Sequence, residues 1–403
     1  MLAEELKDLV KSDLYNCIGC NSCMAACPVS KDSNMTIADL NAATMSEESP
    51  KGAIYDFAVN CVQCGRCVPV CPPGVRRDLL VLYLKYKIKN FPSNYESYVS
   101  LKRPKLSGPK KLALLLLNRI KKNKVGKHYS KLDNPDSLRQ ADILFYPGCY
   151  IFNEVCKKTT AILEYLNLDY EILAGYTTCC GWPQLLQGRL EMAEEMMEDL
   201  NKLIERVSPK IIITSCAECF AALRKMKAMY ITAWNVQTTT EFFLDHLTQL
   251  PVVKFPKTLG FHESCHISRK YFRYEAPRVL LNSLAEWKEL SNNKMDSMCC
   301  YYYNFELDPK NKEHRLNRIK EVKDVAETMV CDCITCHEVY AEKMKESGLE
   351  VIDFNDLIYH CIKEKVKIDE EKGESVEDDP EEIEKEMELK GIDKSIIEND
   401  LKD

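Results

Sequence analysis

The chain has 403 residues, of which 45% are hydrophobic and 29% charged, as in a globular protein of about two to four domains. The net charge of −7 argues against a general nucleic-acid-binding role, and no apolar run approaches the roughly 20 residues that span a bilayer. The N-terminal segment MLAEELKDLVKSDLYN is charged where a signal peptide would be apolar, so we expect a cytoplasmic protein. In such a protein the 21 cysteines are better explained as metal ligands than as disulfides.

Two cysteine motifs with the same spacing dominate the first expected domain, residues 1–100. Each reads C-x2-C-x2-C-x3-C-P, which is the spacing of a 4Fe-4S cubane cluster, and the fourth cysteine of each motif usually ligates the other cube. The segment between the motifs reads helical, so we expect a helical two-cluster ferredoxin-like domain. Zinc sites are the alternative, but zinc does not need this third and fourth cysteine. The expected ligand sets are Cys17, Cys20, Cys23 and Cys71 for one cube, and Cys61, Cys64, Cys67 and Cys27 for the other.

We expect residues 101–140 to form a basic linker with one short helix, because the stretch is rich in lysine and contains proline and glycine. Its leucine-rich part near residues 110–124 either packs on the ferredoxin-like domain or docks on a membrane protein or lipid surface. At the other end of the chain, residues 363–403 are strongly acidic and predict a solvated or loosely helical tail.

Between these segments, short apolar strands alternate with amphipathic helices from residue 141 onward. This alternation predicts βαβ units and a mainly parallel sheet. The pattern then repeats, since KTLGFHESC corresponds to ADILFYPGC and AETMVCDCITC to KIIITSCAEC. We therefore expect an α+β multidomain chain in which the ferredoxin-like module precedes two α/β domains, residues 141–255 and 256–362, related by a pseudo-twofold axis with their ligand sets facing a shared cleft.

Each copy contains a lone cysteine, an adjacent pair and a C-x-x-C motif. Adjacent cysteines do not easily serve two corners of one cube, and five thiolates exceed the four that a cube needs, so either one is spare or the cluster is more open. In the first copy Gly181 follows the pair and permits a positive φ. The first set is Cys149, Cys179, Cys180, Cys216 and Cys219, and the second is Cys265, Cys299, Cys300, Cys333 and Cys336.

The run of YPGC, CCG and CAEC, followed by its second copy, resembles the cysteine-rich CCG domains of heterodisulfide reductase. With the preceding two-cluster module, residues 10–362 resemble the fused D-subunit type, and iron–sulfur subunits of glycolate and glycerol-3-phosphate dehydrogenases share this layout. The resemblance implies electron transport in methanogenesis, with a noncubane 4Fe-4S cluster on each set of five cysteines. It further implies that two cubanes deliver single electrons and that the disulfide of coenzyme M and coenzyme B is split between the noncubane clusters.

The second copy departs from this pattern. Tyr301 replaces the glycine after the cysteine pair, and its Cβ resists a positive φ. Cys331 is a surplus cysteine that either replaces Cys333 or adds a ligand. This copy therefore holds a normal noncubane cluster, an altered cluster, a zinc ion or a different substrate pocket.

Two histidines and two cysteines stand outside the ligand sets. His262 and His266 flank Cys265, and each either donates a proton to a departing thiolate or is a structural hydrogen-bonder; His266 is the catalytic candidate. Cys156 and Cys361 belong to neither copy's set and are expected to be buried apolar residues.

Three functions are compatible with these motifs. The first, which we favour, is a heterodisulfide-reductase-like enzyme acting on a small disulfide or thiol. The second is an electron-transfer subunit of a flavin-dependent hydroxy-acid or glycerol-3-phosphate dehydrogenase, and the third is a scaffold with zinc in the paired-cysteine domains. The chain has no glycine-rich phosphate loop. It therefore needs a partner protein for electron exchange, such as a flavoprotein, a hydrogenase-type protein or a membrane cytochrome, and through it gains any association with a membrane.

Overall fold

The computed structural model describes residues 2–30, 34–89, 91, 138–148, 153–174, 178–302 and 309–362. The predicted helix near residues 110–124, the acidic tail and Cys149 lie outside these residues. Within the described residues, no helix combines the length and the apolar character needed to cross a membrane.

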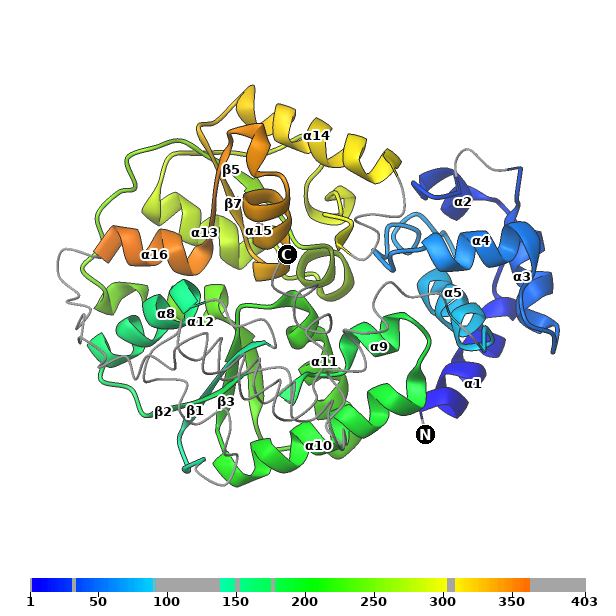
Figure 1. Ribbon diagram of the computed structural model, residues 1–403, viewed down its shortest axis with the longest axis horizontal. Helices are drawn as coiled ribbons and strands as arrows, with labels where there is room; N and C mark the ends of the chain where they lie inside the picture. The colour runs from blue at the N-terminus through cyan, green and yellow to red at the C-terminus, as the bar shows by residue number, and fades with distance from the viewer. Residues whose placement is uncertain are drawn as a thin grey trace, which may run out of the picture.

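The N-terminal part is helical, as predicted (Figure 1). Thr36 begins the third helix with a capping box, in which its side chain accepts a hydrogen bond from the Asp39 amide while Asp39 accepts one from the Thr36 amide. Leu40, Phe57 and Leu84 belong to the hydrophobic core of this helical part and are at most 4% exposed. The helices are α1 (Leu2–Tyr15), α2 (Ser22–Ala26), α3 (Ile37–Met45), α4 (Gly52–Asn60) and α5 (Arg77–Tyr86).

Two four-stranded sheets follow, and every strand pairing in the described residues is parallel. Their strand orders are β2-β1-β3-β4 and β6-β5-β7-β8, which is the same order repeated. The predicted fold class and duplication are therefore confirmed. The strands are β1 (Ile143–Gly148), β2 (Tyr170–Ala174), β3 (Ile211–Thr214), β4 (Asn235–Thr238), β5 (Leu259–His262), β6 (Trp287–Lys288), β7 (Thr328–Cys331) and β8 (Glu350–Asp353).

Helices cover these sheets and join the two domains. In the first domain they are α8 (Asn153–Tyr165), α9 (Trp182–Leu186), α10 (Leu190–Val207), α11 (Ala217–Tyr230), α12 (Thr239–Asp245) and η4 (Leu247–Gln249). In the second they are η5 (Cys265–Lys270), α13 (Glu275–Leu284), η6 (Lys294–Asp296), α14 (Pro309–Lys323), α15 (Ile334–Glu338), η8 (Val339–Lys343), η9 (Lys345–Ser347) and α16 (Phe354–Ile362). Helix α8 packs against α16 while α12 packs against α13. Because α8 corresponds to α13 and α12 to α16, these reciprocal contacts are those of a pseudo-twofold pair.

The helical module docks on both α/β domains, and in the second one Lys270 Nζ lies 3.9 Å from the Asp78 carboxylate of α5. Helix α1 meets the N-terminal end of α10 (Figure 1), where the Leu2 amide donates to Glu194 Oε2 at 3.3 Å. Helix α5 meets the turn at Gly188, where an added Cβ would lie 2.4 Å from the Tyr86 nitrogen. The module therefore has a defined position relative to the cysteine-rich domains.

Candidate metal-cluster sites

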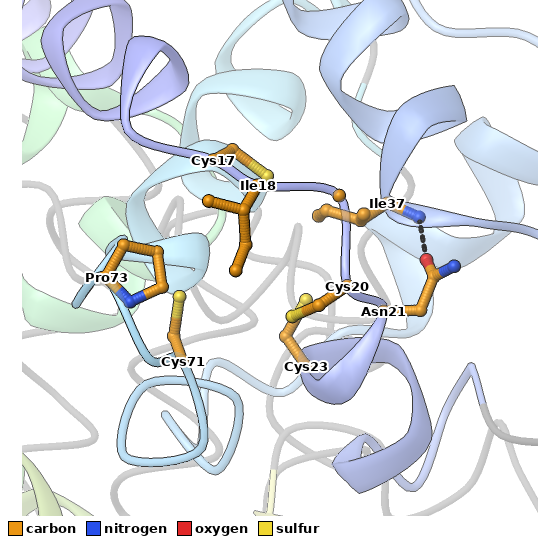
Figure 2. A pocket seen from close by; sticks show the side chains of 9 residues that line it. Cys17, Ile18, Cys20, Asn21, Cys23, Ile37, Cys71 and Pro73 are labelled. Atoms are coloured by element: carbon orange, nitrogen blue, oxygen red, sulfur yellow. Dashed lines mark hydrogen bonds between the residues drawn. The ribbon is translucent and has the colours of Figure 1, made fainter.

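The first ferredoxin-type set surrounds one small pocket. Cys17, Cys20, Cys23 and Cys71 all line it, together with Pro73 (Figure 2). The structure thus brings the fourth cysteine of the second motif to the first three of the first motif, as the spacing predicts. Cys20 is exposed, so this set lies at the surface of the protein.

The second ferredoxin-type set lies deeper. Burial, with smaller contributions from the neighbouring Cys27 and Cys64 thiols, raises the pKa of Cys61 to about 11 although Lys85 lowers it. Burial likewise raises the pKa of Cys64, with contributions from Cys265 and Cys27. Cys67 is in the same group. Burial is the main cause that raises its pKa, followed by the charge of Asp78, and the neighbouring Cys64 and Cys61 thiols also raise it. The structure therefore gathers Cys27 with Cys61, Cys64 and Cys67, which is the crossed set that the sequence predicts.

The second ferredoxin-type set adjoins the second paired-cysteine set. Cys64 packs against a small buried cluster that consists of Val62, Cys265, Cys299 and Tyr301. A Cβ added at the next residue, Gly65, would lie 3.4 Å from Cε of Lys270 in η5. The sequence does not predict this contact, because nothing in the spacing of either motif specifies which α/β domain the module touches.

The first paired-cysteine set is buried between the two domains. Cys219 Sγ lies 3.7 Å from Cys180 Sγ, and Cys179 and Cys216 are also buried. Gly148 ends β1 at φ +111°, where an added Cβ would lie 3.4 Å from Cys219 Sγ. Strand β1 therefore ends directly against this set, at the carboxyl edge of the sheet where ligands bind in parallel α/β folds.

Gly181 has φ +75°, as expected, and the backbone and side chains of α10 approach it closely. A Cβ there would lie 2.9 Å from the Ala193 carbonyl oxygen and 3.1 Å from Met196 Cβ in α10. The glycine thus lets the cysteine-pair turn pack closely against α10.

The second paired-cysteine set is also assembled in the structure. Cys265 Sγ lies 3.7 Å from Cys299 Sγ. Hydrogen bonds with Cys299 and Cys336 lower the pKa of Cys300 to about 6, so the lone cysteine, the pair and the C-x-x-C motif meet. Cys333 is the N-cap of α15, as Cys216 is of α11. The surplus Cys331 is the last residue of β7, the place that Thr214 has in β3, so Cys333 keeps the motif position.

Tyr301 adopts the conformation that its side chain was expected to resist. Its φ is +58°, close to the +75° of Gly181. The Tyr301 amide donates to Cys299 Sγ at 3.3 Å, and its ring stacks on His314 with centroids 5.3 Å apart. Arg315 Nη2 donates to its carbonyl oxygen at 3.2 Å. These contacts hold the residue in a left-handed conformation at a cost of about 1–2 kcal/mol.

The two C-x-x-C motifs meet across the domain interface. The Ala217 amide donates to Cys333 Sγ at 3.4 Å. In the other direction, the Ile334 amide donates to the Ser215 carbonyl oxygen at 3.1 Å. Cys216 Sγ and Thr335 Oγ1 lie 3.8 Å apart. The two paired-cysteine sets are therefore neighbours.

Both candidate histidines are buried. His266 contacts Trp182 of the first domain edge to face, with ring centroids 5.9 Å apart, and burial holds its pKa well below the usual range. His262 is 0% exposed and lies 4.8 Å from the Tyr340 ring, measured between centroids. Cys156 and Cys361 are each 1% exposed and belong to a hydrophobic core, as expected.

Two pairs of thiols, Cys180 with Cys219 and Cys265 with Cys299, lie 3.7 Å apart. Zinc–sulfur bonds of about 2.3 Å place sulfurs about 3.8 Å apart. In the described part of the chain, the ligand atoms that lie in a group of three within 4.8 Å of one another belong to no cysteine.

Comparison with protein families agrees with this layout. Residues 13–75 match the 4Fe-4S dicluster domain, and residues 143–224 and 259–339 each match the cysteine-rich domain CCG. The chain therefore carries 4Fe-4S clusters in its N-terminal module and two cysteine-rich domains after it, and it is similar to the D-type subunit of heterodisulfide reductase, as the sequence predicted.

Three relatives illustrate the range of similar proteins. The B-type subunit of fumarate reductase (CoM/CoB) from Methanothermobacter marburgensis is 27% identical over 38% of this chain and 32% of its own length. The D-type subunit of dihydromethanophenazine:CoB–CoM heterodisulfide reductase from Methanosarcina barkeri is 24% identical over 40% of this chain and 43% of its own length. Lactate utilization protein A 2 of Bacillus mycoides is 30% identical over 32% of this chain and 58% of its own length. The matches thus span less than half of the first two relatives.

Proposed function

We propose that this protein is an iron–sulfur oxidoreductase that reduces a small disulfide, such as that of coenzyme M and coenzyme B. Two 4Fe-4S cubanes would bind Cys17, Cys20, Cys23 and Cys71, and Cys61, Cys64, Cys67 and Cys27. Noncubane clusters would bind the two paired-cysteine sets, with Cys149 completing the first. The similarity to the D-type subunit of heterodisulfide reductase supports this assignment.

The order of the ligand sets is the observation that carries the proposal. The set containing Cys20 is at the surface, the next set packs through Cys64 against Cys265 and Cys299, and Cys333 contacts the first domain beside Cys216. Electrons would therefore enter at the surface set and reach the first domain last. A partner protein that exchanges electrons would bind near Cys20.

The chemistry balances with two electrons and two protons. The S–S bond of the substrate breaks, each sulfur gains one electron, and two thiols result. When bound, the clusters supply these electrons one at a time. His266, which follows Cys265 in the chain and contacts Trp182 of the first domain, is proposed to hydrogen-bond a departing sulfur as a neutral ring, since burial lowers its pKa, while the protons come from solvent.

The test is turnover of the disulfide with a reduced dye as donor, measured on anaerobically purified protein. Cys180→Ser should abolish turnover, because Cys180 lies 3.7 Å from Cys219 in the first set, and it should leave the EPR signals of the cubanes unchanged. Retained turnover in this variant would rule out the proposal. Iron analysis provides a second readout: four clusters give about 16 iron atoms per chain, whereas about 8 would eliminate the noncubane clusters.

An alternative function is electron transfer within a dehydrogenase complex. The similarity to lactate utilization protein A 2 favours it, as does Tyr301 in the place of a glycine. In that case the protein would co-purify with a flavin-containing protein and would show no disulfide reduction alone. About 12 iron atoms with one zinc per chain would indicate that one paired-cysteine site is structural.

A further inference from the structure

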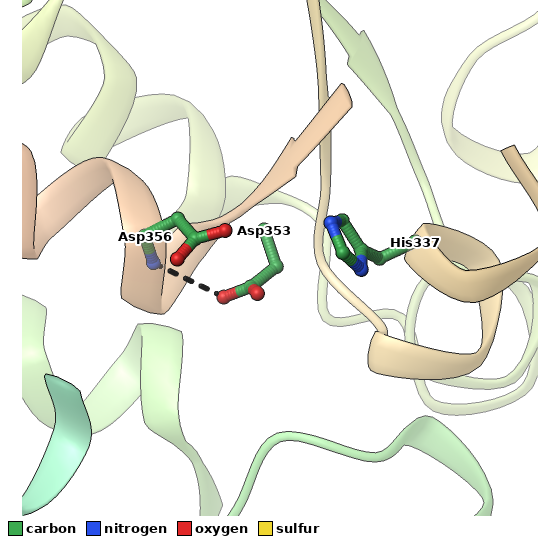
Figure 3. A group of neighbouring side chains, drawn as sticks. All are labelled: His337, Asp353 and Asp356. Atoms are coloured by element: carbon green, nitrogen blue, oxygen red, sulfur yellow. Dashed lines mark hydrogen bonds between the residues drawn. The ribbon is translucent and has the colours of Figure 1, made fainter. Parts of the chain in front are cut away.

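A group of three side chains without cysteine lies at the carboxyl edge of the second sheet. Ligand atoms of His337, Asp353 and Asp356 all lie within 4.8 Å of one another. His337 belongs to α15, Asp353 ends β8 and Asp356 belongs to α16. Figure 3 shows the His337 ring across from the two carboxyl groups. None of these residues has a role in the proposed disulfide reduction.

Asp353 presents an unpaired carboxylate oxygen to this group. The residue is 2% exposed. Its Oδ1 accepts hydrogen bonds from the Asn355 amide at 2.6 Å, from Asn355 Nδ2 at 2.8 Å and from the Asp356 amide at 3.2 Å. Its Oδ2 is buried and has no hydrogen-bond partner among the described residues. The three donors therefore fix the position of the carboxylate. Its second oxygen has no partner, and an unpaired polar atom is costly in a protein interior.

His337 has the complementary property. Its Nδ1 is buried and also lacks a hydrogen-bond partner among the residues that the structure describes. The imidazole and the Asp353 carboxylate are close, yet they do not bond to each other. An atom placed between them would satisfy both groups.

The remaining charges leave room for a cation. Asp356 forms an ion pair with Lys158 of the first domain, so one positive charge balances one of the two carboxylates. The second carboxylate, Asp353, forms no ion pair with a lysine or arginine in the described part of the chain, since Lys158 pairs with Asp356. We propose that His337, Asp353 and Asp356 bind one divalent transition-metal ion, because one imidazole and two carboxylates form a nitrogen–oxygen ligand set suited to Zn²⁺, Mn²⁺ or Fe²⁺.

The ion would connect three parts of the molecule. It would tie α15, which contains Cys336, to β8 and α16. Two interactions extend this connection into the first domain. Asp356 pairs with Lys158, and Asn355 Nδ2 donates to Ser215 Oγ at 3.2 Å. The ion is thus a structural centre, distinct from the iron–sulfur clusters, that fixes the C-x-x-C turn of the second domain at the interface.

Manganese distinguishes this site from the thiol sites, because carboxylates and imidazole bind Mn²⁺ whereas thiolates favour softer metals. We would titrate the oxidised, cluster-loaded full chain with Mn²⁺ and follow the EPR signal of free Mn²⁺. The wild type should bind one Mn²⁺ per chain, with a nitrogen coupling in pulsed EPR from His337. Asp353→Asn should weaken binding at least tenfold, and His337→Gln should remove the nitrogen coupling. Asp324→Asn removes an exposed carboxylate of the same domain and should bind as the wild type does.

Iron content checks that each variant is folded. Wild-type protein that binds no Mn²⁺ would overturn the proposal, as would Mn²⁺ bound without nitrogen coupling. Equal binding by the wild type and both site variants would do the same. If Asp353→Asn loses its iron, two other measurements test the proposal. They are the nitrogen coupling in the wild type and the Mn²⁺ affinity of Asp356→Asn, which changes a partly exposed ligand and should also be weakened.

Discussion

The Ala217 amide of one cysteine-rich domain donates a hydrogen bond to the Cys333 sulfur of the other, at 3.4 Å. Ala217 is the first residue of α11, so this amide is one of the free N–H groups at the positive end of the helix. Hydrogen bonds from Cys216 and Cys336, aided by the Ala217 amide, hold the pKa of Cys333 well below its usual range. The first domain therefore stabilises negative charge on a proposed cluster ligand of the second domain.

Replacing Ala217 with proline should remove this hydrogen bond and push the Cys333 sulfur away from α11, because the proline Cδ takes the place of the amide hydrogen. Proline is tolerated at the first position of a helix, and the preceding Cys216 already has the extended conformation that proline requires, with φ −105° and ψ 121°. Hydrogen bonds to cluster sulfurs raise the reduction potential, so we expect the potential of the second-domain centre to fall by on the order of 50 mV, equivalent to about 1 kcal/mol for one electron. Redox titration monitored by EPR measures the shift. Ala217→Ser keeps the amide and should leave the potential unchanged; an equal shift in both variants would refute the role of the hydrogen bond.

Gly188 provides a test of how the helical module docks. Both Gly188 and Gly348 have positive φ, +77° and +68°, so alanine at either position introduces left-handed strain of about 1 kcal/mol. Only at position 188 would the new Cβ also overlap another element, 2.4 Å from the Tyr86 nitrogen and 2.6 Å from the Lys85 carbonyl carbon, whereas nothing lies within 4 Å at Gly348. We therefore expect Gly188→Ala to displace α5 and to slow electron transfer from the dicluster module at least tenfold, as measured by rapid-freeze EPR. Gly348→Ala should transfer electrons at the wild-type rate, and similar rates in the two variants would contradict this docking.

Local sequence patterns predicted the elements but not their contacts. The apolar run of ADILFYPGC produced β1 because its residues are buried on both faces, as in a parallel sheet. The crossed ligand sets followed from C-x3-C-P spacing alone. By contrast, the contact of Cys64 with Cys265 and Cys299 depends on how whole domains pack. Motif spacing and local periodicity do not predict such a contact.

The group of His337, Asp353 and Asp356 illustrates the same limit. Two of its members come from adjacent elements, β8 and α16, but His337 is separated from them by η8 and η9. Single histidine and aspartate residues have no distinctive spacing. The side chains converge only because β7 and β8 are parallel neighbours whose carboxyl ends meet.

Tyr301 is predicted to stabilise the second domain despite its unfavourable backbone. Tyr301→Gly would relieve about 1–2 kcal/mol of left-handed strain but would lose a ring that is 3% exposed and stacked on His314, a loss of about 3–5 kcal/mol for a buried aromatic residue. Because the loss of packing exceeds the relief of strain, we expect a net destabilisation of about 2 kcal/mol in chemical unfolding. Tyr301→Phe keeps the ring and should change stability by less than about 1 kcal/mol. A glycine variant more stable than the wild type would show that strain outweighs packing at this position.

Asp78 joins the helical module to the second cysteine-rich domain. It accepts two hydrogen bonds from Arg76, each at 2.9 Å, and lies 3.9 Å from Lys270 Nζ of η5. Burial opposes its ionisation, but Arg76 and Lys270 together hold the pKa of Asp78 below its ordinary value. The side chains of Asp78 and Lys270 are 2% and 10% exposed, so solvent screens this pair only weakly.

Asp78→Asn should therefore destabilise the docked module at neutral pH by about 3–5 kcal/mol, because Lys270 is left without its buried counter-charge. The sign of the pH dependence follows from the lowered pKa: the contribution of Asp78 is complete above its unfolded value of about 3.9 and is lost as pH falls through the lower folded value. The difference in unfolding free energy between wild type and variant should thus be constant from pH 7 to about 5 and shrink below about 4. Unfolding monitored by circular dichroism across this range measures it. Glu48→Gln breaks an ion pair whose side chains are 75–80% exposed and should leave stability unchanged, because solvent screens the pair. A difference between wild type and Asp78→Asn that grows on acidification would contradict the ionised state of Asp78 at the interface.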